Sequence, residues 1–410
     1  MTKPLEGITI LDATTFLSGP YATLLLAGMG AQVIKVEQPK SGDPARISPP
    51  FAGKNGAAAK PLDKEDLSFG ILKRGRDKQS ITLNLKHDKG KEIFKELAKR
   101  VDVVVENFRP GTMDKLGVGY ERLKELNPGL IYCSLTGFGL SGSYRDLPAF
   151  DIVVQAMSGL MSINGMPGSP PAKTGVILGD LAGGLFSVIG ILAALRHREI
   201  TGKGQLVETS MLDALLALIL DEAPDFWASQ GHSVQMGNRL LRLTPFNSYP
   251  TMDGYIVIAS GNDQHWERLL KAMKRGDLIE DSCFNSQSQR TANADEVDAI
   301  IAEWSRSMTT QEAADILVKH EVPSGPVRDV IDVLQDKELA KRGTIVDIQH
   351  PTAGTIEGFK TWGFPIKFSE AEAGFEQPAP FLGAHNKDIY QDLLGYTAAE
   401  MEELKSNNVI

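Results

Sequence analysis

The sequence contains little of the chemistry that metal sites, disulfide frameworks and nucleic-acid surfaces require. Its 410 residues include only 2 cysteines, Cys133 and Cys283, too few for a disulfide framework or a cysteine zinc site. The 7 histidines are scattered, with no HExxH motif and no close pair, so we predict no bound metal. The net charge of −9 argues against a nucleic-acid partner, because the phosphate backbone favours a basic surface.

Targeting signals and long apolar runs are also scarce. The N-terminal stretch MTKPLEGITILDA lacks a charged-then-apolar signal segment, which predicts a cytoplasmic location. The longest apolar runs, at 181–195 and 211–220, are shorter than the roughly 20 residues of a membrane span. We therefore expect buried helices in both places and no membrane partner.

Common nucleotide and hydrolase motifs are missing as well. The stretch GMGAQV (28–33) lacks the third glycine of a dinucleotide fingerprint, and TGKGQ (201–205) lacks the spacing of a P-loop. No GxSxG nucleophile elbow occurs.

The sequence does contain an alternation of short β-branched runs and helical patterns. Strand-like runs occur at 8–14, 31–37, 80–86, 101–108 and 130–138, with helical patterns at 21–30 and 89–100. This alternation predicts a doubly wound α/β domain with a mostly parallel sheet, whose active site lies at the carboxyl ends of the strands. The stretch 48–68, rich in Gly, Pro and Ala, predicts a surface loop.

The second half of the chain changes character. Residues 151–220 predict helix, and DEAPDF (221–226) ends it. A hairpin pattern at 244–260 and amphipathic helices at 265–274, 294–304 and 310–320 predict a smaller α+β domain, followed by a strand-like tail and a final helix. We therefore expect a large domain formed by 1–224 and 331–410, and a small domain at 225–330.

One carboxylate, Asp180 in TGVILGDLAGGLF, lies at the start of a long apolar segment. One interpretation is a helix N-cap, because Asp accepts backbone N–H bonds there. The other is a nucleophile, kept anionic by the helix N-terminus and poorly hydrated by its apolar neighbours. The backbone N–H groups of Gly183 and Gly184 would then stabilise an oxyanion.

Other candidates lie near strand ends. Asp12 is most simply a turn or cap residue. Asn107 and Phe108 follow a strand where an α/β site would form, or they are turn residues. Lys86, Arg109 and Lys115 would meet phosphates there, or are solvated.

Five stretches together carry a family resemblance. They are PLEGITILDATTFLSGPYATLLLAGMGAQVIKVEQPKSGDPAR, LNLKHDKGKEIFKELAKRVDVVVENFRPGTMDKLG, ERLKELNPGLIYCSLTGFG, LGDLAGGLFSVIGILAALRHREITGKGQLVETSMLDA and PAPFLGAHNKDIYQDLLGYTAAEMEELKSNNVI. The chain resembles the class III CoA-transferases, the formyl-CoA transferase family, which also includes α-methylacyl-CoA racemase. The similarity runs nearly end to end.

The resemblance implies a fold and a site. It implies a doubly wound large domain built from both termini, a small domain between them, and an intertwined homodimer. It places the family nucleophile on Asp180, with coenzyme A bound as an acyl-CoA substrate and no metal. The residues it implies for CoA contact are Phe16, Leu17, Ser18, Gln38, Leu83, Asn84, Leu85, Lys86, Asn107, Phe108, Arg109, Lys115, Phe150 and Asp151.

Departures from the family pattern narrow the activity. Members that act on formate and oxalate carry a basic residue, a lysine and a tyrosine at the positions of Gln38, Pro148 and Phe150, and a glycine-rich loop that 237–261 lacks. The racemases carry a proton-transferring histidine at the position of Phe150. We therefore expect a CoA-transferase, with an α-methylacyl-CoA racemase or epimerase as the alternative. A non-catalytic CoA-binding protein is a third possibility, against which the poised Asp180 argues.

The acyl group is suggested by two arginines. Arg239 and Arg242 in GNRLLRLTPFNSYP precede the expected hairpin, and arginine binds carboxylates bidentately. They predict a dicarboxylic substrate of the succinyl-CoA type, unless they are paired within the fold or solvated.

Overall fold

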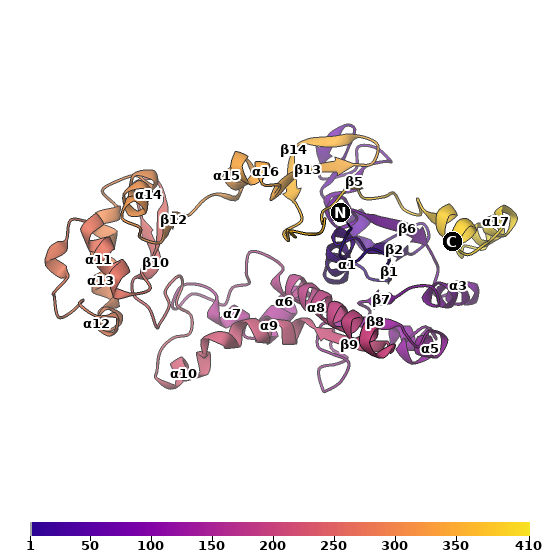
Figure 1. Cartoon of the computed structure of the whole chain (residues 1–410), viewed down its shortest axis with the longest axis horizontal. Coiled ribbons are helices and arrows are strands. Elements are labelled where there is room, and N and C mark those ends of the chain that lie inside the picture. The colour runs from indigo at the N-terminus through magenta and orange to yellow at the C-terminus, as the bar shows by residue number, and fades with distance from the viewer. Residues whose placement is uncertain (1) are drawn as a thin grey trace. The chain divides into compact units, whose positions relative to one another are not determined.

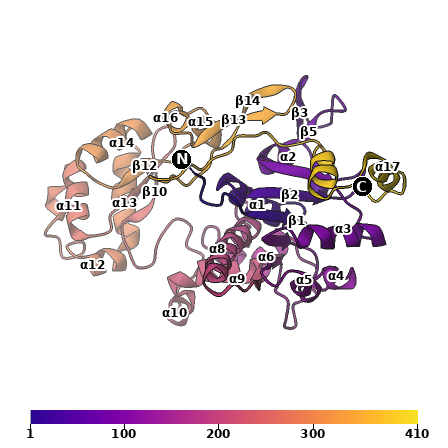
Figure 2. The same ribbon diagram turned by 45° about the vertical axis from the view of Figure 1, so that its right-hand side comes forward.

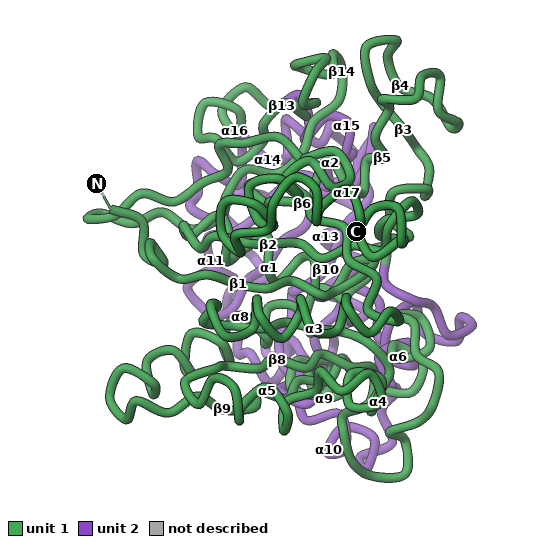
Figure 3. Tube along the Cα trace, turned by 90° about the vertical axis from the view of Figure 1, so that its right-hand side faces the viewer, with its two compact units in different colours: residues 1–158, 175–219, 336–410 green, residues 159–174, 220–335 purple. Residues whose placement is uncertain are grey.

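The computed structural model describes residues 2–410, and contacts within the chain divide it into two units (Figure 3). Unit 1 comprises residues 1–158, 175–219 and 336–410, and unit 2 comprises 159–174 and 220–335. Sequence patterns placed the boundaries at 224/225 and 330/331. They gave no sign that 159–174 would cluster with the second unit.

Unit 1 contains a six-stranded parallel sheet of order β6-β2-β1-β7-β8-β9 (Figure 1). Its strands are β1 (Thr9–Asp12), β2 (Gln32–Glu37), β6 (Lys78–Thr82), β7 (Val103–Glu106), β8 (Ile131–Thr136) and β9 (Gln205–Ser210). The expected parallel α/β sheet is confirmed. The sixth strand, β9, was not predicted, because residues 151–220 were expected to be helical throughout.

Apolar side chains cover both faces of this sheet. Ile10 of β1 lies in a cluster with α1 (Ser18–Gly28) and α8 (Leu178–Thr201). Its neighbour Leu11 lies in a second cluster, which is built on α3 (Asp88–Ala98), α5 (Tyr120–Leu126), η4 (Lys387–Leu393) and α17 (Ala398–Ser406). Adjacent residues of a strand point to opposite faces, so the sheet is doubly wound. Helices α1 and α8 lie side by side in Figures 1 and 2.

The remaining elements of unit 1 are short. They are η1 (Pro44–Ile47), β3 (Phe51–Gly53), β4 (Gly56–Ala58), β5 (Leu67–Ser68), α2 (Phe69–Arg74), α4 (Thr112–Lys115), α6 (Asp151–Met157), α9 (Met211–Ile219), α16 (Lys337–Lys341), β13 (Ile345–His350) and β14 (Gly354–Trp362). The stretch 48–68 was predicted to be a loop, but it contains a three-stranded antiparallel sheet of order β4-β3-β5. Its strands are too short to show a period in the sequence.

Helix α8 is longer than the apolar run that predicted it. It has 24 residues, and by length and composition alone it is apolar enough to cross a membrane. Buried side chains on α8 pack in the same cluster as β8 and α1, so it serves as a core helix of unit 1. Its first turn carries Asp180.

Unit 2 has its own apolar core. Its elements are α7 (Leu160–Ile163), η2 (Leu220–Glu222), α10 (Pro224–Ser229), β10 (Phe246–Pro250), β11 (Tyr255–Ala259), α11 (Asp263–Ala272), η3 (Gly276–Leu278), α12 (Gln287–Ala292), α13 (Ala294–Ser305), α14 (Thr310–Lys319), β12 (Ser324–Pro326) and α15 (Val330–Leu334). The expected hairpin is the antiparallel pair β10–β11, and the three expected helices are α11, α13 and α14. Their apolar faces meet in a single buried cluster.

Candidate active site

A loop between β1 and α1 is fixed by side chains from neighbouring strand ends. The N–H of Thr15 donates to Asn107 Oδ1 at 2.8 Å, and Asn107 Nδ2 donates to the carbonyl of Thr15 at 2.9 Å. The N–H of Phe16 donates to Asp43 Oδ1 at 3.1 Å, and Phe16 has a φ of 64°. The Phe16 ring remains 48% exposed and meets the ring of Phe150 edge-on, with centroids 6.2 Å apart.

A buried ion network supports this loop from below. Asp12 Oδ2 pairs with Lys78 Nζ at 3.0 Å, and Lys35 Nζ pairs with Asp43 Oδ2 at 3.0 Å. Burial raises the pKa of Asp12, but the charges of Lys35 and Lys78 outweigh that effect and hold the pKa well below its usual range. Asp12 also accepts the N–H of Thr14 at 3.0 Å, as the turn interpretation predicted. Its role is to anchor the loop.

Asp180 occupies the first turn of α8 and is not its N-cap. The cap position is Ile177, which makes no side-chain cap bond, so the N-cap interpretation of Asp180 is wrong. The cap is supplied by Asp151 of α6, whose Oδ1 accepts the N–H groups of Gly179 at 2.7 Å and Asp180 at 3.3 Å. Its Oδ2 accepts Gln155 Nε2 at 2.6 Å. Asp151 was expected to contact CoA, but both of its carboxylate oxygens are used within the fold.

The environment of Asp180 suits a nucleophile. Burial and the negative charge of Asp151 raise the pKa of Asp180 to about 6, against the opposing effects of the Ser18 hydroxyl and the Arg74 charge. At neutral pH the carboxylate is therefore mostly ionised, yet only partly hydrated. A carboxylate in this state attacks an electrophile more readily than a fully solvated one.

Asp180 lines a cavity of about 480 Å³ in unit 1. Among the described residues that line it, Asp180 is the only carboxylate and none is histidine. Three arginines, Arg74, Arg109 and Arg145, share the wall. The predicted site residues that the structure brings together here are Phe16, Leu17, Ser18, Asn107, Phe108, Arg109, Phe150 and Asp180. The cavity is therefore positively charged and open to an anionic ligand.

A second cavity of about 490 Å³ adjoins the first, since Thr15 and Phe108 line both. The predicted residues that line this second cavity are Gln38, Leu83, Leu85, Lys86 and Phe108. Most of the expected CoA-contacting residues thus gather along one continuous wall at the carboxyl ends of the strands.

Three predicted CoA contacts lie outside both cavities: Asp151, described above, Asn84 and Lys115. Asn84 Nδ2 donates to the carbonyl of Asn408 at 3.1 Å, and its N–H donates to the carbonyl of Val409 at 2.8 Å. Lys115 is exposed at the end of α4. Asn84 thus fastens the C-terminal segment to the strand β6 side of the sheet.

The structure gives Gly183 and Gly184 a packing role, and their oxyanion role stays a prediction. Both lie buried in the second turn of α8, where helical N–H groups bond to carbonyls one turn back. A Cβ on Gly184 would lie 2.8 Å from the Ser18 carbonyl oxygen, and one on Gly183 would lie 3.1 Å from Leu135 Cδ1. The glycines therefore allow α8 to approach α1 and β8 closely.

The arginines expected to bind substrate are paired within unit 2. Arg239 contacts Asp298 Oδ2 at 2.6 Å and Asp295 Oδ1 at 2.7 Å. Arg242 contacts Glu222 Oε1 at 3.0 Å. This arrangement corresponds to the alternative that both arginines serve ion pairs of the fold.

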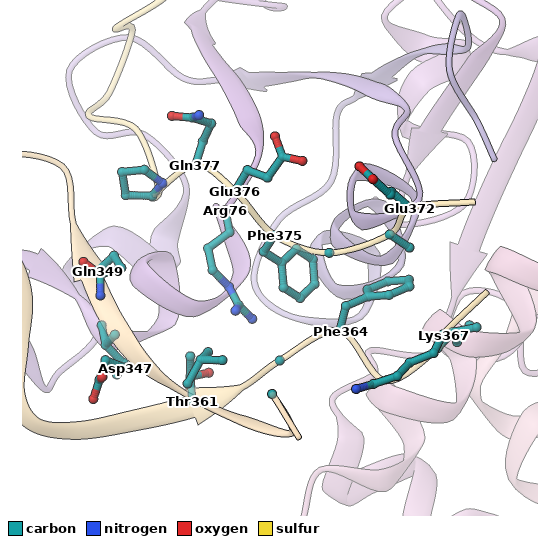
Figure 4. Close-up of a pocket in the computed structure, with 18 of the residues that line it drawn as sticks. Arg76, Asp347, Gln349, Thr361, Phe364, Lys367, Glu372, Phe375, Glu376 and Gln377 are labelled. Atoms are coloured by element: carbon teal, nitrogen blue, oxygen red, sulfur yellow. The ribbon is translucent and has the colours of Figure 1, made fainter. Parts of the chain in front are cut away.

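A larger cavity of unit 1, about 760 Å³, is lined by none of the predicted site residues (Figure 4). Its central cation is Arg76, whose guanidinium lies 4.0 Å from the ring centroid of Phe375 and 5.1 Å from that of Trp362. Arg76 Nη1 and Nε donate to the carbonyls of Trp362 and Lys73, each at 3.0 Å. Arg76 therefore joins α2 to the β14 segment. Within residues 2–410, no cluster of three or more His, Cys, Asp or Glu is arranged to hold a metal ion.

Comparison with known proteins identifies the family. The sequence matches CoA-transferase family III over residues 5–386, and the chain belongs to this family. It is 37% identical over 392 residues to succinyl-CoA:mesaconate CoA-transferase of Haloarcula marismortui, which covers 95% of this chain and 96% of the relative. It is 34% identical over 409 residues to succinyl-CoA:glutarate CoA-transferase of Homo sapiens, covering 100% of this chain and 90% of the relative. The crystal structure of a CAIB/BAIF family protein from Brucella suis superposes with a TM-score of 0.81 at 34% identity, covering 96% of this chain and 100% of that one. The chain is thus a class III CoA-transferase.

Sequence reasoning missed Arg74 and the capping role of Asp151. Arg74 stands in LKRGRDK, where the sequence offers several equivalent basic residues. Asp151 is separated by 28 residues from the N–H group that it caps. Neither role has a local signature.

Proposed function

We propose that this chain transfers CoA from an acyl-CoA to a carboxylic acid through covalent intermediates on Asp180. The observation that carries the proposal is the position of Asp180. It is the single carboxylate of a cavity lined by three arginines and by the residues expected to contact CoA. Family membership supports the same reaction class.

The reaction would proceed in four exchanges. Asp180 attacks the thioester carbonyl, which forms an aspartyl–acyl anhydride and releases CoA thiolate. The thiolate attacks the aspartyl carbonyl of the anhydride, which forms an aspartyl–CoA thioester and releases the donor acid. The acceptor carboxylate attacks this thioester to give a new anhydride and thiolate. The thiolate then attacks the acyl carbonyl, which yields the new acyl-CoA and restores Asp180.

The two adjoining cavities offer a path for CoA. We place the thioester end in the cavity of Asp180 and the nucleotide end in the cavity that Gln38 and Lys86 line. Lys86 and Arg109 would neutralise phosphate groups, as basic side chains commonly do. The shared residues Thr15 and Phe108 would flank the connecting arm.

A dicarboxylic acid is the proposed acyl group. The relatives named succinyl-CoA:mesaconate and succinyl-CoA:glutarate CoA-transferases support a succinyl-type donor and a short dicarboxylate acceptor. The excess of arginine over carboxylate in the cavity supports an anionic substrate independently. Proton exchange by a racemase is less favoured, because the described cavity residues offer no second base beside Asp180.

The experiment that tests the proposal is the replacement Asp180→Asn. We expect transfer from succinyl-CoA to a dicarboxylate to fall by about 10³-fold or more, because the covalent route is lost. Hydroxylamine trapping of the wild-type enzyme with succinyl-CoA, followed by mass spectrometry of peptides, should modify Asp180. Substantial transfer by Asp180→Asn, or trapping at another residue, would contradict the mechanism.

We also propose that the chain forms the intertwined homodimer that the resemblance implies. In support, Leu185, Ile189 and Ile200 of α8 are 46%, 60% and 68% exposed, an unusual apolar exposure on a core helix. Sedimentation equilibrium should give twice the chain mass, and a monomer at micromolar concentration would exclude the dimer.

A further inference from the structure

Arg74 is the last residue of α2, and two features of this helix fix its position. Ser68 Oγ accepts the N–H of Ile71 at 3.2 Å and donates to the carbonyl of Ala45 at 2.6 Å, which anchors the start of this short helix. A Cβ on Gly70 would lie 2.7 Å from Arg74 Nη2, so the guanidinium occupies the space that this glycine leaves open. The side chain therefore reaches the wall of the Asp180 cavity from a fixed base.

The Arg74 side chain contacts no carboxylate directly among the described residues. Within residues 2–410, the Arg74 side chain makes no hydrogen bond and no ion pair of 4 Å or less, although it is half-buried. Burial lowers the pKa of Arg74, and the negative charges of Asp43 and Asp180 oppose that shift. Arg46, by contrast, donates to both carboxylate oxygens of Glu37, at 2.6 and 2.7 Å. A partly buried guanidinium without a partner points to an anionic ligand.

The other two arginines of the cavity differ from Arg74. Arg109 is exposed at the rim, and Arg145 Nη1 lies 3.8 Å from its neighbour Asp146 Oδ1. Arg74 is the cation whose charge acts on Asp180. We therefore expect a group attached to Asp180 to contact Arg74 in preference to Arg109 or Arg145.

The proposed reaction changes the charge balance around Arg74. When Asp180 becomes an anhydride or a thioester, its negative charge disappears, and of the two anions that act on Arg74 only Asp43 remains, which already pairs with Lys35 at 3.0 Å. A free carboxylate on the acyl group would replace that charge. A monocarboxylic acyl group would leave the half-buried Arg74 with no carboxylate but Asp43, which it shares with Lys35, and this is costly.

We infer that Arg74 binds the distal carboxylate of a short dicarboxylic acyl group held at Asp180, and so selects dicarboxylates over monocarboxylates. This inference rests on the proposed function of Asp180. It assigns the recognition of the acid to unit 1, to a residue on the same cavity as the nucleophile, and not to Arg239 or Arg242 of unit 2.

The test compares two acceptors of equal length, succinate and butyrate, both isotopically labelled, with a fixed unlabelled succinyl-CoA donor. The label is needed because transfer to succinate regenerates succinyl-CoA, and incorporation of label into acyl-CoA measures the rate. In a ping-pong reaction the kcat/KM of the acceptor does not depend on the donor, so the ratio of the two values reports recognition of the distal carboxylate alone. In Arg74→Gln we expect the succinate-to-butyrate ratio to fall about 10- to 100-fold, as for the loss of a charge-assisted hydrogen bond. Arg74→Lys should keep an intermediate ratio, because it retains the charge but not the planar fork.

The matched control is Arg122→Gln, which removes an exposed arginine of α5 that pairs with Glu125 at 2.5 Å, and it should leave the ratio unchanged. An unchanged ratio in Arg74→Gln, with both acceptors equally slowed, would overturn the inference while leaving the proposed function intact. If wild-type enzyme transfers no CoA, the proposed function fails. Calorimetric titration with succinate then decides the inference: binding weakened by Arg74→Gln, and retained in part by Arg74→Lys, upholds a carboxylate site, and unchanged binding overturns it.

Discussion

Arg74 and Arg76 are two residues apart in the chain, yet they line different cavities, and their guanidinium groups have different surroundings. Arg76 faces the larger cavity, where two aromatic rings and two main-chain carbonyls surround its guanidinium. Arg74 faces the smaller cavity, where no such partner is present among the described residues and Asp180 is the single carboxylate. Cavity size therefore does not identify the site. A better indicator of the candidate site is an arginine without a direct partner beside a carboxylate of raised pKa.

The largest expected effect concerns the acid limb of the pH profile. Because the pKa of Asp180 is raised to about 6, its carboxylate, which we propose as the nucleophile, is ionised above that pH and protonated below it. We expect kcat/KM for the acyl-CoA donor to fall about tenfold per pH unit below pH 6, and to level off above it. Initial rates from pH 4.5 to 8 measure this, with circular dichroism at each pH to show that the chain stays folded. A rate independent of pH down to 4.5 would contradict the assigned environment of Asp180.

A smaller effect tests whether Arg76 stabilises the fold without contributing to substrate selection. Arg76→Met removes the stacked cation and leaves the carbonyls of Lys73 and Trp362 without their donors. We expect the free energy of unfolding to fall by ~2–4 kcal/mol, as for a buried network. Urea denaturation measures the loss, and the succinate-to-butyrate ratio of the folded fraction should stay at its wild-type value. A changed ratio would mean that the two arginines do not divide their roles.

The smallest effect concerns Asp151, which accepts the backbone N–H of Asp180, the proposed nucleophile. Asp151→Asn keeps an oxygen that can accept the N–H groups of Gly179 and Asp180, but it removes the negative charge that raises the pKa of Asp180. The midpoint of the acid limb should therefore move to lower pH, while the melting temperature changes little. Asp347→Asn, an exposed carboxylate of the larger cavity, is the control and should leave the midpoint in place. A midpoint moving upward in Asp151→Asn would refute the electrostatic account.

The sequence predicts most of the sheet but not all of it. Five of the six parallel strands show β-branched apolar runs between helical patterns, which is the signature of strands buried on both faces. The sixth, β9, reads QLVETS between two strongly apolar helices. Its residues alternate between partly buried and exposed, and only Ser210 is fully buried, so its signal was lost among those of the helices. The small sheet within 51–68 was missed because its strands have only two or three residues, too few to show an alternating pattern.

The candidate site divides in the same way. Asp180 was identifiable because a carboxylate beside a glycine pair in an apolar run is unusual, and the residues near it followed from the resemblance. Its capping by Asp151 depends on a contact between α6 and α8 that no local pattern encodes. The significance of Arg74 depends on which partners it lacks, and a sequence does not display that. The packing role of Gly183 and Gly184 likewise depends on how close α1 and β8 approach.

The position of the C-terminal segment has a consequence for how the chain is made. Ile389, Tyr390, Met401 and Leu404 fill the core under α3, and the carbonyl of Val409 accepts the N–H of Asn84 beside the second cavity. These residues are synthesised after the whole of unit 2, which includes the contiguous residues 220–335. The strands made first therefore have one face uncovered while unit 2 is synthesised. During that interval an apolar face of the sheet stays uncovered, and such a face favours aggregation of the incomplete chain.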